Sequence, residues 1–275
     1  MIQVGIIGSG FIGPAHLEAL RRVGDIEVVA LCDSSLEAAQ RKAQALNIAH
    51  AYDSVEALLT HPGLQVVHNC TPNHLHAQIN RQILAAGLHV FSEKPLCMTA
   101  EEARELVTLA ARAGVVHGVS FVYRQFAMVQ QAAAMIRHGD VGRIFAAHGG
   151  YLQDWMLLET DYNWRVDSAQ GGASRTVADI GSHWCDTVQF MTGRRIVEVM
   201  ADLSIVWPTR KAPVNGKATF SAVHEAQGYE TRPVDTEDFG SVLLRFDDGS
   251  KGSFMVSQVS AGRKNRLAVE INGSR

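Results

Sequence analysis

A glycine motif directly behind the first apolar run constrains the fold of this chain more than any other feature. Gly8, Gly10 and Gly13 form a G-x-G-x-x-G pattern. They follow the apolar run Ile2–Ile7, and a helical pattern starts at Pro14. Glycines between a strand and a helix permit a tight turn and let backbone N–H groups approach a pyrophosphate, which the helix N-terminus also attracts. The sequence therefore predicts a βαβ dinucleotide-binding unit at the start of the chain.

An acidic residue ends the next predicted strand, over residues 26–32. Asp33 lies 20 residues beyond Gly13, where a carboxylate can accept hydrogen bonds from both ribose hydroxyls of an adenosine and repel a 2′-phosphate. Ser34 and Ser35 follow without an Arg or Lys to neutralise such a phosphate, so NAD is favoured over NADP. Serines also bind phosphate, which leaves NADP open. The alternative is a helix-capping Asp in an ordinary βαβ turn.

Length and charge restrict the class of protein. The 275 residues suit two moderate domains. Acidic residues number 28 and basic residues 25, so the chain gives no sign of binding nucleic acid or an anionic membrane. No apolar run approaches the roughly 20 residues that span a bilayer, and no basic region precedes the first strand as in a signal peptide. Four widely spaced cysteines predict reduced thiols in a cytoplasmic protein.

Strand and helix patterns alternate up to residue 121 and then change. The alternation implies right-handed crossovers and a parallel sheet covered on both faces, which is a doubly wound Rossmann domain over residues 1–123. For residues 124–275 we expect an α+β domain with an open, mainly antiparallel sheet and helices on one face. Its expected helices are 126–137 and 179–191, and its extended runs are 143–153, 196–206, 218–223, 239–247, 251–259 and 265–272.

Two polar segments follow predicted strands of the first domain. Thr71–His76 follows the strand 66–70, and Glu93–Pro95 follows the strand 89–92. Ligands collect at the carboxyl ends of parallel strands, so both segments are candidates for a binding site. We expect residues 71–76 to form a loop before a helix over 77–86, with Pro-Asn as a turn pair. His74 and His76 lack a patterned third ligand, so no metal is expected.

Together these motifs resemble those of the Gfo/Idh/MocA family, which includes glucose–fructose oxidoreductase and inositol dehydrogenase. The resemblance covers the whole chain and rests on the glycine motif, Thr71–His76, Glu93–Pro95 and Asp179–Asp186, in the family's order. Tyr151–Trp155 and the segment 163–165 look more narrowly like members that act on sugars and anhydrosugars such as levoglucosan. Family members continue further, so the second domain looks truncated at its carboxyl end.

The resemblance implies an NAD(P)-dependent oxidoreductase that moves a hydride between nicotinamide and a secondary hydroxyl or keto group of a sugar, anhydrosugar or cyclitol. It makes His183 the general acid/base, Lys94 the group that polarises the alcohol, and Asp179 the group that orients the substrate. Asp179 and His183 are four residues apart on a predicted helix and share one face. An imidazole pKa of about 6.5 suits reversible proton transfer. A structural histidine and an N-cap aspartate are the alternatives.

The resemblance also supplies contacts and partners. The implied cofactor contacts are Gly8, Gly10, Phe11, Ile12, Asp33, Thr71, Pro72, Asn73, His76, Glu93 and Lys94. The candidate substrate contacts are Tyr123, Gln153, Trp164 and Arg165, since a sugar is bound by hydrogen bonds and an aromatic face. Glu93 could instead bond a backbone amide. An NAD-dependent glycoside hydrolase and a catalytically silent nucleotide- or sugar-binding protein stay open, and a homodimer or homotetramer is implied.

Overall fold

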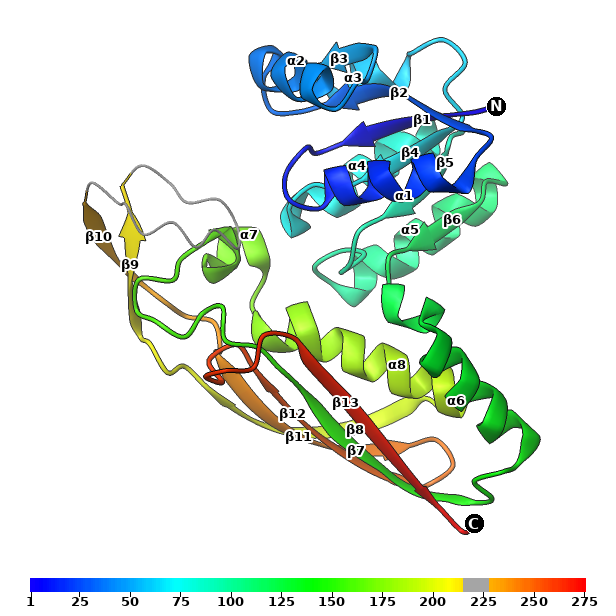
Figure 1. Ribbon diagram of the computed structural model, residues 1–275, viewed down its shortest axis with the longest axis vertical. Coiled ribbons are helices and arrows are strands. Elements are labelled where there is room, and N and C mark those ends of the chain that lie inside the picture. Colours follow the sequence, from blue (N-terminus) through cyan, green and yellow to red (C-terminus); the bar gives the residue numbers. More distant parts are fainter. Residues whose placement is uncertain (215–227) are drawn as a thin grey trace. The chain divides into compact units, whose positions relative to one another are not determined.

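The computed structural model describes residues 1–214 and 228–275 (Figure 1). The chain divides into two compact units, Met1–Ser120 and Phe121–Arg275. The extended run expected over 218–223 lies outside the described residues. Within the described ranges, none of the helices is long and apolar enough to cross a membrane.

The first unit is built on a six-stranded parallel sheet. Its strands are β1 (Ile2–Ile7), β2 (Ile26–Cys32), β3 (His50–Tyr52), β4 (Val66–Asn69), β5 (His89–Ser92) and β6 (His117–Val119). Its helices are α1 (Gly13–Val23), α2 (Leu36–Ala45), α3 (Val55–Leu59), α4 (Asn73–Ala85) and α5 (Ala100–Ala113). The strand order β3-β2-β1-β4-β5-β6 is that of a Rossmann fold, which confirms the prediction. Such a sheet binds ligands beyond the strands' carboxyl ends, where the order reverses between β1 and β4.

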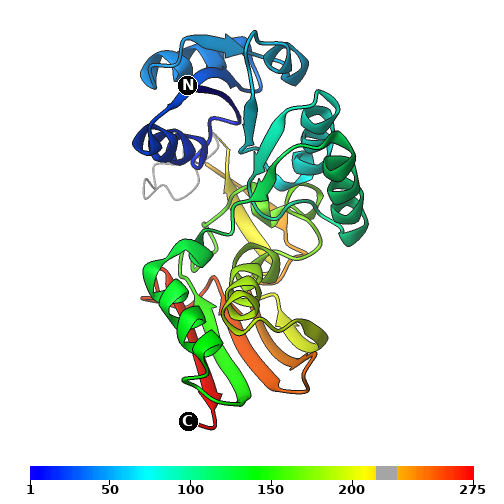
Figure 2. The ribbon, with the colours of Figure 1, turned by 90° about the vertical axis from the view of Figure 1, so that its right-hand side faces the viewer.

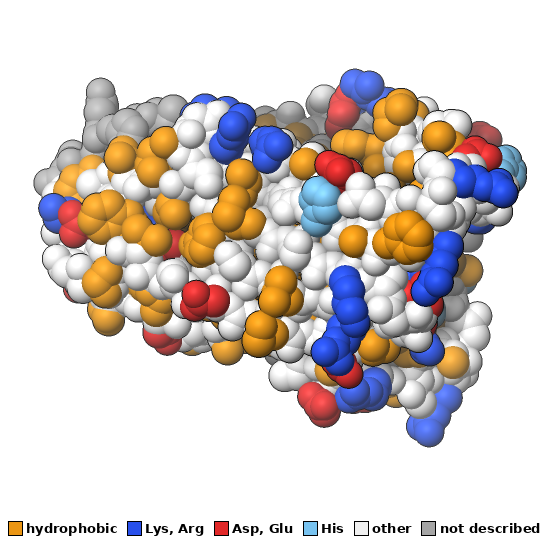
Figure 3. Space-filling model, turned by 90° about the horizontal axis from the view of Figure 1, so that it is seen from below, with side chains coloured by type: hydrophobic (Ala, Val, Ile, Leu, Met, Phe, Trp, Pro, Cys, Tyr) orange, Lys and Arg blue, Asp and Glu red, His pale blue; other side chains and the backbone are white. Residues whose placement is uncertain are grey.

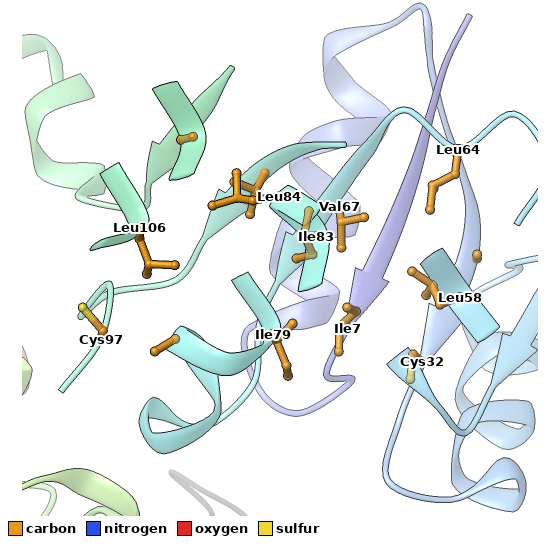
Figure 4. Close-up of a cluster of buried hydrophobic side chains, with 14 of the residues drawn as sticks. Ile7, Cys32, Leu58, Leu64, Val67, Ile79, Ile83, Leu84, Cys97 and Leu106 are labelled. Carbon is orange, nitrogen blue, oxygen red and sulfur yellow. The ribbon is translucent and has the colours of Figure 1, made fainter. Parts of the chain in front are cut away.

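Two apolar clusters cover the two faces of this sheet. Val4 and Ile6 of β1 belong to a cluster with Leu17 of α1. Ile7 at the end of the same strand belongs to another, shown in Figure 4, together with Ile83 of α4. Neighbouring side chains of a strand point to opposite faces, so β1 contributes to both clusters. Packing on both faces of the sheet therefore holds the carboxyl ends of β1, β4 and β5 in place.

The second unit is a five-stranded sheet with helices on one face (Figures 1 and 2). Its strands are β7 (Ile144–Leu152), β8 (Ile196–Ser204), β11 (Phe239–Phe246), β12 (Lys251–Ser257) and β13 (Arg266–Gly273), in the order β13-β7-β12-β11-β8. Only β7 and β12 pair in parallel among these strands, so the sheet is mainly antiparallel, as predicted. The helices are α6 (Ala127–His138) and α8 (Ser182–Thr192). Trp184 of α8 stacks on Phe254 of β12 with ring centroids 4.6 Å apart.

The segment before α8 departs from a regular α-helix. Val177–Gly181 forms a π-helical turn, η3, and Asp179 lies in it. Such single turns occur often at functional sites. The chain entering η3 is anchored by Glu237, whose carboxylate accepts from the backbone N–H groups of Arg175 and Val177 at 3.1 and 2.9 Å. Asp238 next to it pairs with the buried guanidinium groups of Arg175 and Arg210.

One local prediction was wrong, and two local features were not predicted. Helix α4 begins at Asn73 rather than at residue 77, because Pro72 at its N-cap has an extended backbone (φ −63°, ψ 154°) and the helix starts directly after it. Residues 154–170, for which no helix or strand was predicted, contain the turns η2 (Trp164–Val166) and α7 (Ser168–Gly171), which the side chains of Asn163 and Asp167 cap. The antiparallel pair β9 (Thr209–Pro213) and β10 (Tyr229–Pro233) was not expected, since its polar residues show no alternating pattern.

Candidate functional site

The three glycines of the motif are needed for different physical reasons. Gly8 has φ 94°, and a Cβ there would lie 2.6 Å from the carbonyl oxygen of Cys70. A Cβ on Gly13 would collide with the carbonyl oxygen of Gly8. At Gly10, by contrast, no atom of the described residues lies within 4 Å of the Cβ position. Gly8 and Gly13 therefore serve the packing of the loop, and Gly10 leaves open space beside it.

The loop leads into the N-terminus of α1 at the carboxyl end of β1. Within the described residues, the N-cap residue Ile12 makes no side-chain hydrogen bond to the helix, and Pro14 lies in the first turn. The positive end of a helix whose first N–H groups are not capped by a side chain suits a phosphate. Phe11 in the same loop is 64% exposed.

Asp33, directly after β2, is held beside the glycine loop. One carboxylate oxygen accepts from the backbone N–H of Ser9 at 3.1 Å and from its hydroxyl, and the other accepts from the N–H of Ser34 at 2.7 Å. Burial would raise the pKa of Asp33, but the hydrogen bonds from Ser9 and Ser34 lower it below its ordinary value. The residue therefore presents a fixed negative charge at the tip of β2.

A chain of buried amides fixes the ends of β4 and β5. Asn69 at the end of β4 accepts from the Thr71 hydroxyl at 2.7 Å and donates to the side chain of Asn80 on α4 at 2.9 Å. Asn80 in turn donates to the hydroxyl of Ser92 at the end of β5 at 3.0 Å. Each buried amide needs a hydrogen-bond partner inside the protein, and these partners fix the positions of the amides. Thr71 is thus oriented by a network that reaches through the sheet's edge.

His76 ties the same two segments together from beneath. Its ring, in a residue only 1% exposed, lies between two backbone carbonyl oxygens, with Nδ1 2.6 Å from that of Pro95 and Nε2 2.7 Å from that of Thr71. Its position supports the residues named for the cofactor rather than an exposed wall of the site. Asn73 and His74 lie in the first turn of α4, beside Pro72.

Glu93 is buried and faces into the unit. Its carboxylate lies 3.0 Å from Nε2 of His16 on α1 and accepts from the backbone N–H of Lys94 at 3.1 Å. Burial would raise the pKa of Glu93, but His16 and its other partners lower it. Nδ1 of His16 lies 2.9 Å from Nδ1 of His68, and burial together with the charge of His16 lowers the pKa of His68 to about 4. The structure thus contains the backbone-amide contact considered for Glu93.

In the second unit, Asp179 has a different partner for each carboxylate oxygen. Oδ2 accepts from Nε2 of Gln258 at 2.8 Å, and Oδ1 lies 3.5 Å from Nε of Arg165. The guanidinium of Arg165 lies over the ring of Trp164, with 4.4 Å between its central carbon and the ring centroid. A carboxylate between a cation and an amide donor is restricted in its orientation.

His183, on the first turn of α8, is surrounded by aromatic rings. The ring centroids of Phe121, Tyr123 and Tyr151 lie 5.7, 4.9 and 6.2 Å from that of the imidazole. The Phe121 and Tyr123 rings meet it nearly at right angles, an arrangement that fixes the plane of a ring. The histidine is therefore buried to 8% exposure and has little freedom to turn.

Hydroxyl and amide groups continue outward from these rings. Tyr123 and Tyr151 share a hydrogen bond of 2.5 Å, and Tyr151 donates to the side-chain oxygen of Asn265 at 2.6 Å. Gln153 donates to the same oxygen at 2.8 Å and accepts from the indole N–H of Trp155 at 2.8 Å. Burial raises the pKa of Tyr151, and its bond to Tyr123 and the charge of Asp179 raise it further. Tyr151 therefore stays a neutral hydroxyl.

The structure brings the second-unit residues named from the sequence into one cluster. Tyr151 is hydrogen-bonded to Tyr123, shares the Asn265 oxygen with Gln153 and adjoins the His183 ring. The charge of Asp179 acts on Tyr151, and Arg165 links Asp179 to Trp164. Tyr151 and Trp155 were noted only as ends of the stretch that resembles sugar-acting family members and were not named as site residues. The alternation of a strand offered a signal for Tyr151, which lies two residues before Gln153 and therefore on the same side. Gln258 and Asn265 were missed, and no local pattern marks them.

Comparison with known proteins bears on both units. The oxidoreductase family described as having an NAD-binding Rossmann fold matches residues 2–121, and the GFO/IDH/MocA C-terminal domain matches residues 129–275. The chain is 31% identical to the levoglucosan dehydrogenase of Pseudarthrobacter phenanthrenivorans over 282 residues, covering 99% of this chain and 72% of that protein.

Solved structures show the same likeness. A levoglucosan dehydrogenase in complex with NADH and L-sorbose superposes with a TM-score of 0.91 and 30% identity, covering 100% of this chain and 71% of the other. An inositol dehydrogenase homologue from Azotobacter vinelandii in complex with NAD+ gives a TM-score of 0.84 at 28% identity, over 100% of this chain and 69% of the other.

The structure of the glycine loop predicts that a methyl group has a different effect at Gly10 than at Gly13. Gly10→Ala enters open space, so the thermal unfolding temperature should stay within about 1 °C while affinity for NADH falls about tenfold or more, because the methyl group occupies the approach of a phosphate. Gly13→Ala should lower the unfolding temperature by several degrees, because its Cβ collides with the Gly8 backbone. Thermal melts and NADH fluorescence titration check both. Equal loss of stability in the two variants would contradict this assignment.

His68 predicts a specific sensitivity to acid. Its folded pKa of about 4 lies below the unfolded value, so the unfolded chain takes up the proton first and stability falls as the pH drops from 6.5 towards 4. Between pH 6.5 and pH 5 the loss should be roughly 2 kcal/mol. Glu93 acts only at lower pH, because its pKa is lowered too. In urea titrations at both pH values, His68→Gln should show a loss smaller by that amount, and an equal loss would count against the assignment.

Proposed function

This chain belongs to the Gfo/Idh/MocA oxidoreductase family, and on that premise we propose that it transfers a hydride between a bound nicotinamide and a secondary hydroxyl or keto group of a sugar, anhydrosugar or cyclitol. The observation that carries the proposal is the cluster of the second unit. It sets a buried imidazole, His183, and a charge-paired carboxylate, Asp179, on consecutive helical turns. Hydroxyl, amide and indole groups adjoin them. Sugars are bound by this combination of polar groups and aromatic rings.

The first unit fits a dinucleotide. The open space at Gly10 and the N-terminus of α1 would accommodate the pyrophosphate, with Phe11 and Ile12 beside it, and Asp33 would accept from the adenosine ribose. For the nicotinamide half we propose the Thr71–Asn73 segment and Lys94, supported from beneath by His76 and Glu93. When bound, NAD supplies the hydride acceptor for oxidation.

The proton and the charge are handled by the protein's side chains. His183 takes the hydroxyl proton in the oxidative direction and returns it in the reductive direction, and its aromatic surroundings hold the ring in one plane for this task. Asp179 orients the substrate and stabilises positive charge nearby. Lys94 polarises the reacting hydroxyl through its ammonium group. Oxidation thus separates a proton and a hydride from one carbinol.

Substrate contacts follow from the outer part of the cluster. We assign Tyr123, Gln153 and Arg165 as hydrogen-bonding groups and Trp164 as the aromatic face. Arg165 connects this ring to Asp179, because its guanidinium lies over one face of the ring and also approaches the carboxylate. Levoglucosan, an anhydrosugar, is the first substrate to test, since the levoglucosan dehydrogenases are 30–31% identical to this chain over an alignment that covers nearly all of it.

The direct test is turnover with NAD or NADP and a panel of levoglucosan, hexoses, glucosides and inositols, followed by the absorbance of the reduced nicotinamide. Lys94→Ala and His183→Ala should each lower kcat by about 10²- to 10⁴-fold, the range for removal of an acid/base group. The matched controls are Lys251→Ala and His138→Ala, which change exposed residues and should leave kcat unchanged. Cleavage of a glucoside without net nicotinamide reduction would overturn the dehydrogenase proposal in favour of hydrolysis.

Asp33 predicts a preference for NAD over NADP. Its fixed negative charge repels a 2′-phosphate, so Asp33→Ala should raise kcat/KM for NADP relative to NAD by about tenfold or more. Glu37→Ala, which removes an exposed carboxylate on the neighbouring helix α2, should leave the ratio unchanged. An unchanged ratio in the Asp33 variant would show that the discrimination lies elsewhere.

We also propose that a second copy of the chain covers the open face of the second unit's sheet. In Figure 1 α6 and α8 lie above the sheet, so Figure 3 looks from below at its other face, where apolar side chains gather in patches. Leu243 of β11 and Met200 of β8 are cross-strand neighbours and are 52% and 67% exposed. Exposed apolar patches on a sheet face are a usual site of symmetric association.

The association is tested by light scattering coupled to size-exclusion chromatography. The wild-type protein should elute as a dimer or tetramer, and Leu243→Lys should shift it towards the monomer, because a lysine on the covered face would lose its hydration. Val116→Lys, at an exposed apolar position of the first unit, is the matched control. A monomeric wild-type protein, or no shift in the Leu243 variant, would refute the proposal.

A further inference from the structure

A fully buried glutamine lies beneath the proposed catalytic carboxylate. Gln258 follows β12 directly and is 0% exposed. Its main chain is fixed on both sides, because its N–H donates to the carbonyl of Asp238 at 3.0 Å and its own carbonyl accepts from the N–H of Met156 at 3.1 Å. A buried amide is costly unless its polar atoms find partners, so its position calls for an explanation. The fixed main chain therefore restricts the directions that the side chain can take.

The side chain of Gln258 is directed at Asp179. Nε2 of Gln258 donates to Oδ2 of Asp179 at 2.8 Å, and Oε1 lies 3.4 Å from the hydroxyl of Thr176, one turn earlier. The amide can be placed only one way round, because the opposite orientation would direct Oε1 at the carboxylate. Thr176 itself is fixed by a 2.7 Å hydrogen bond to the carbonyl of Glu237.

The two oxygens of Asp179 therefore differ in kind. The ion pair with Arg165 is longer, at 3.5 Å, and Arg165 is one of the residues proposed for the substrate. The hydrogen bond from Gln258 is shorter, at 2.8 Å, and its donor is fully buried. A short hydrogen bond fixes direction better than a longer ion pair does. Gln258 thus sets the rotation of the carboxylate while its other oxygen can respond to a ligand.

We propose that Gln258 is a positioning residue for the reaction, acting through Asp179 by holding one carboxylate oxygen and turning the other towards the substrate. This inference rests on the proposed function for the role of Asp179. It adds a residue that lies 79 positions away in the sequence and does not touch the reacting atoms. Misplacing a catalytic group by about 1 Å can cost on the order of 10²-fold in rate, so the effect should be measurable.

The first arm of the test compares kinetics of matched variants. Gln258→Met keeps the length of the side chain and removes the donor, so kcat for the sugar should fall about 10- to 100-fold while the Kd for NADH stays unchanged. Gln189→Met is the control, because Gln189 makes a structural hydrogen bond to the N–H of Ile196 in the same unit. It should keep the wild-type kcat. An unchanged kcat in the Gln258 variant would overturn the inference.

A second variant keeps the test decisive if Gln258→Met does not fold. In Gln258→Glu a protonated carboxyl can donate to Asp179, whereas an ionised one repels it. The charged residues near this position in the described part of the chain include Asp179, Arg165 and Glu237, together with Asp238 and its ion-pair partner Arg175. The kcat of this variant relative to wild type should therefore rise as the pH is lowered from 8 to 6. A ratio independent of pH would contradict a role as hydrogen-bond donor.

Crystal structures of the wild-type protein and one Gln258 variant form the arm that does not need turnover. The Asp179 carboxylate should bond Gln258 in the wild type and adopt another rotamer or two conformers in the variant. An Asp179 that keeps its place in the variant refutes the positioning role. If the wild-type protein turns over none of the sugars, the proposed function fails, and these structures still decide whether Gln258 positions Asp179.

Discussion

A polar side chain removed from water has to find its partner inside the protein, and both units of this chain are organised around that requirement. In the first unit, Asn69, Asn80 and Ser92 hydrogen-bond in series and join the ends of β4 and β5. In the second, Asp238 pairs with the buried guanidinium groups of both Arg175 and Arg210. Hydrophobic packing alone would hold the sheets together but leave these connecting segments free to move. The buried partners give the loops fixed positions.

The same requirement explains why the proposed functional residues have fixed positions although several belong to loops or short turns. Loops at the edge of a sheet have few apolar contacts of their own. Here the segment after β4 is held through His76 and the segment after β5 through Glu93, each by side chains that are almost fully buried. An arrangement fixed before a ligand arrives avoids reorganisation during the reaction, which is the main benefit of a preformed polar site.

The first unit could be predicted almost in full, because alternating strands and helices with right-handed crossovers leave few topologies. Asp179 and His183 were named from the family resemblance, and their spacing predicted one helical face, whereas Asp179 lies in the π-helical turn η3 and His183 in the first turn of α8. The partners that complete the cluster could not be predicted. Gln258 lies 79 residues from Asp179, and Asn265 lies 114 residues from Tyr151, so only the folded sheet brings them together. The early start of α4 depended on one backbone angle at Pro72.

The π-helical turn η3 has a consequence for how the segment before α8 can evolve. The chain entering it is fixed to Glu237, and the helix leaving it is fixed by Trp184 against the sheet. Each residue of an α-helix advances the direction of its side chain by about 100°. If the same residues formed a regular α-helix, the contact with Glu237 and the packing of Trp184 could not both be made in the present directions. The wider π-helical turn corrects the direction of the chain between them. The number of residues between the two attachments is therefore constrained more tightly than most of their identities.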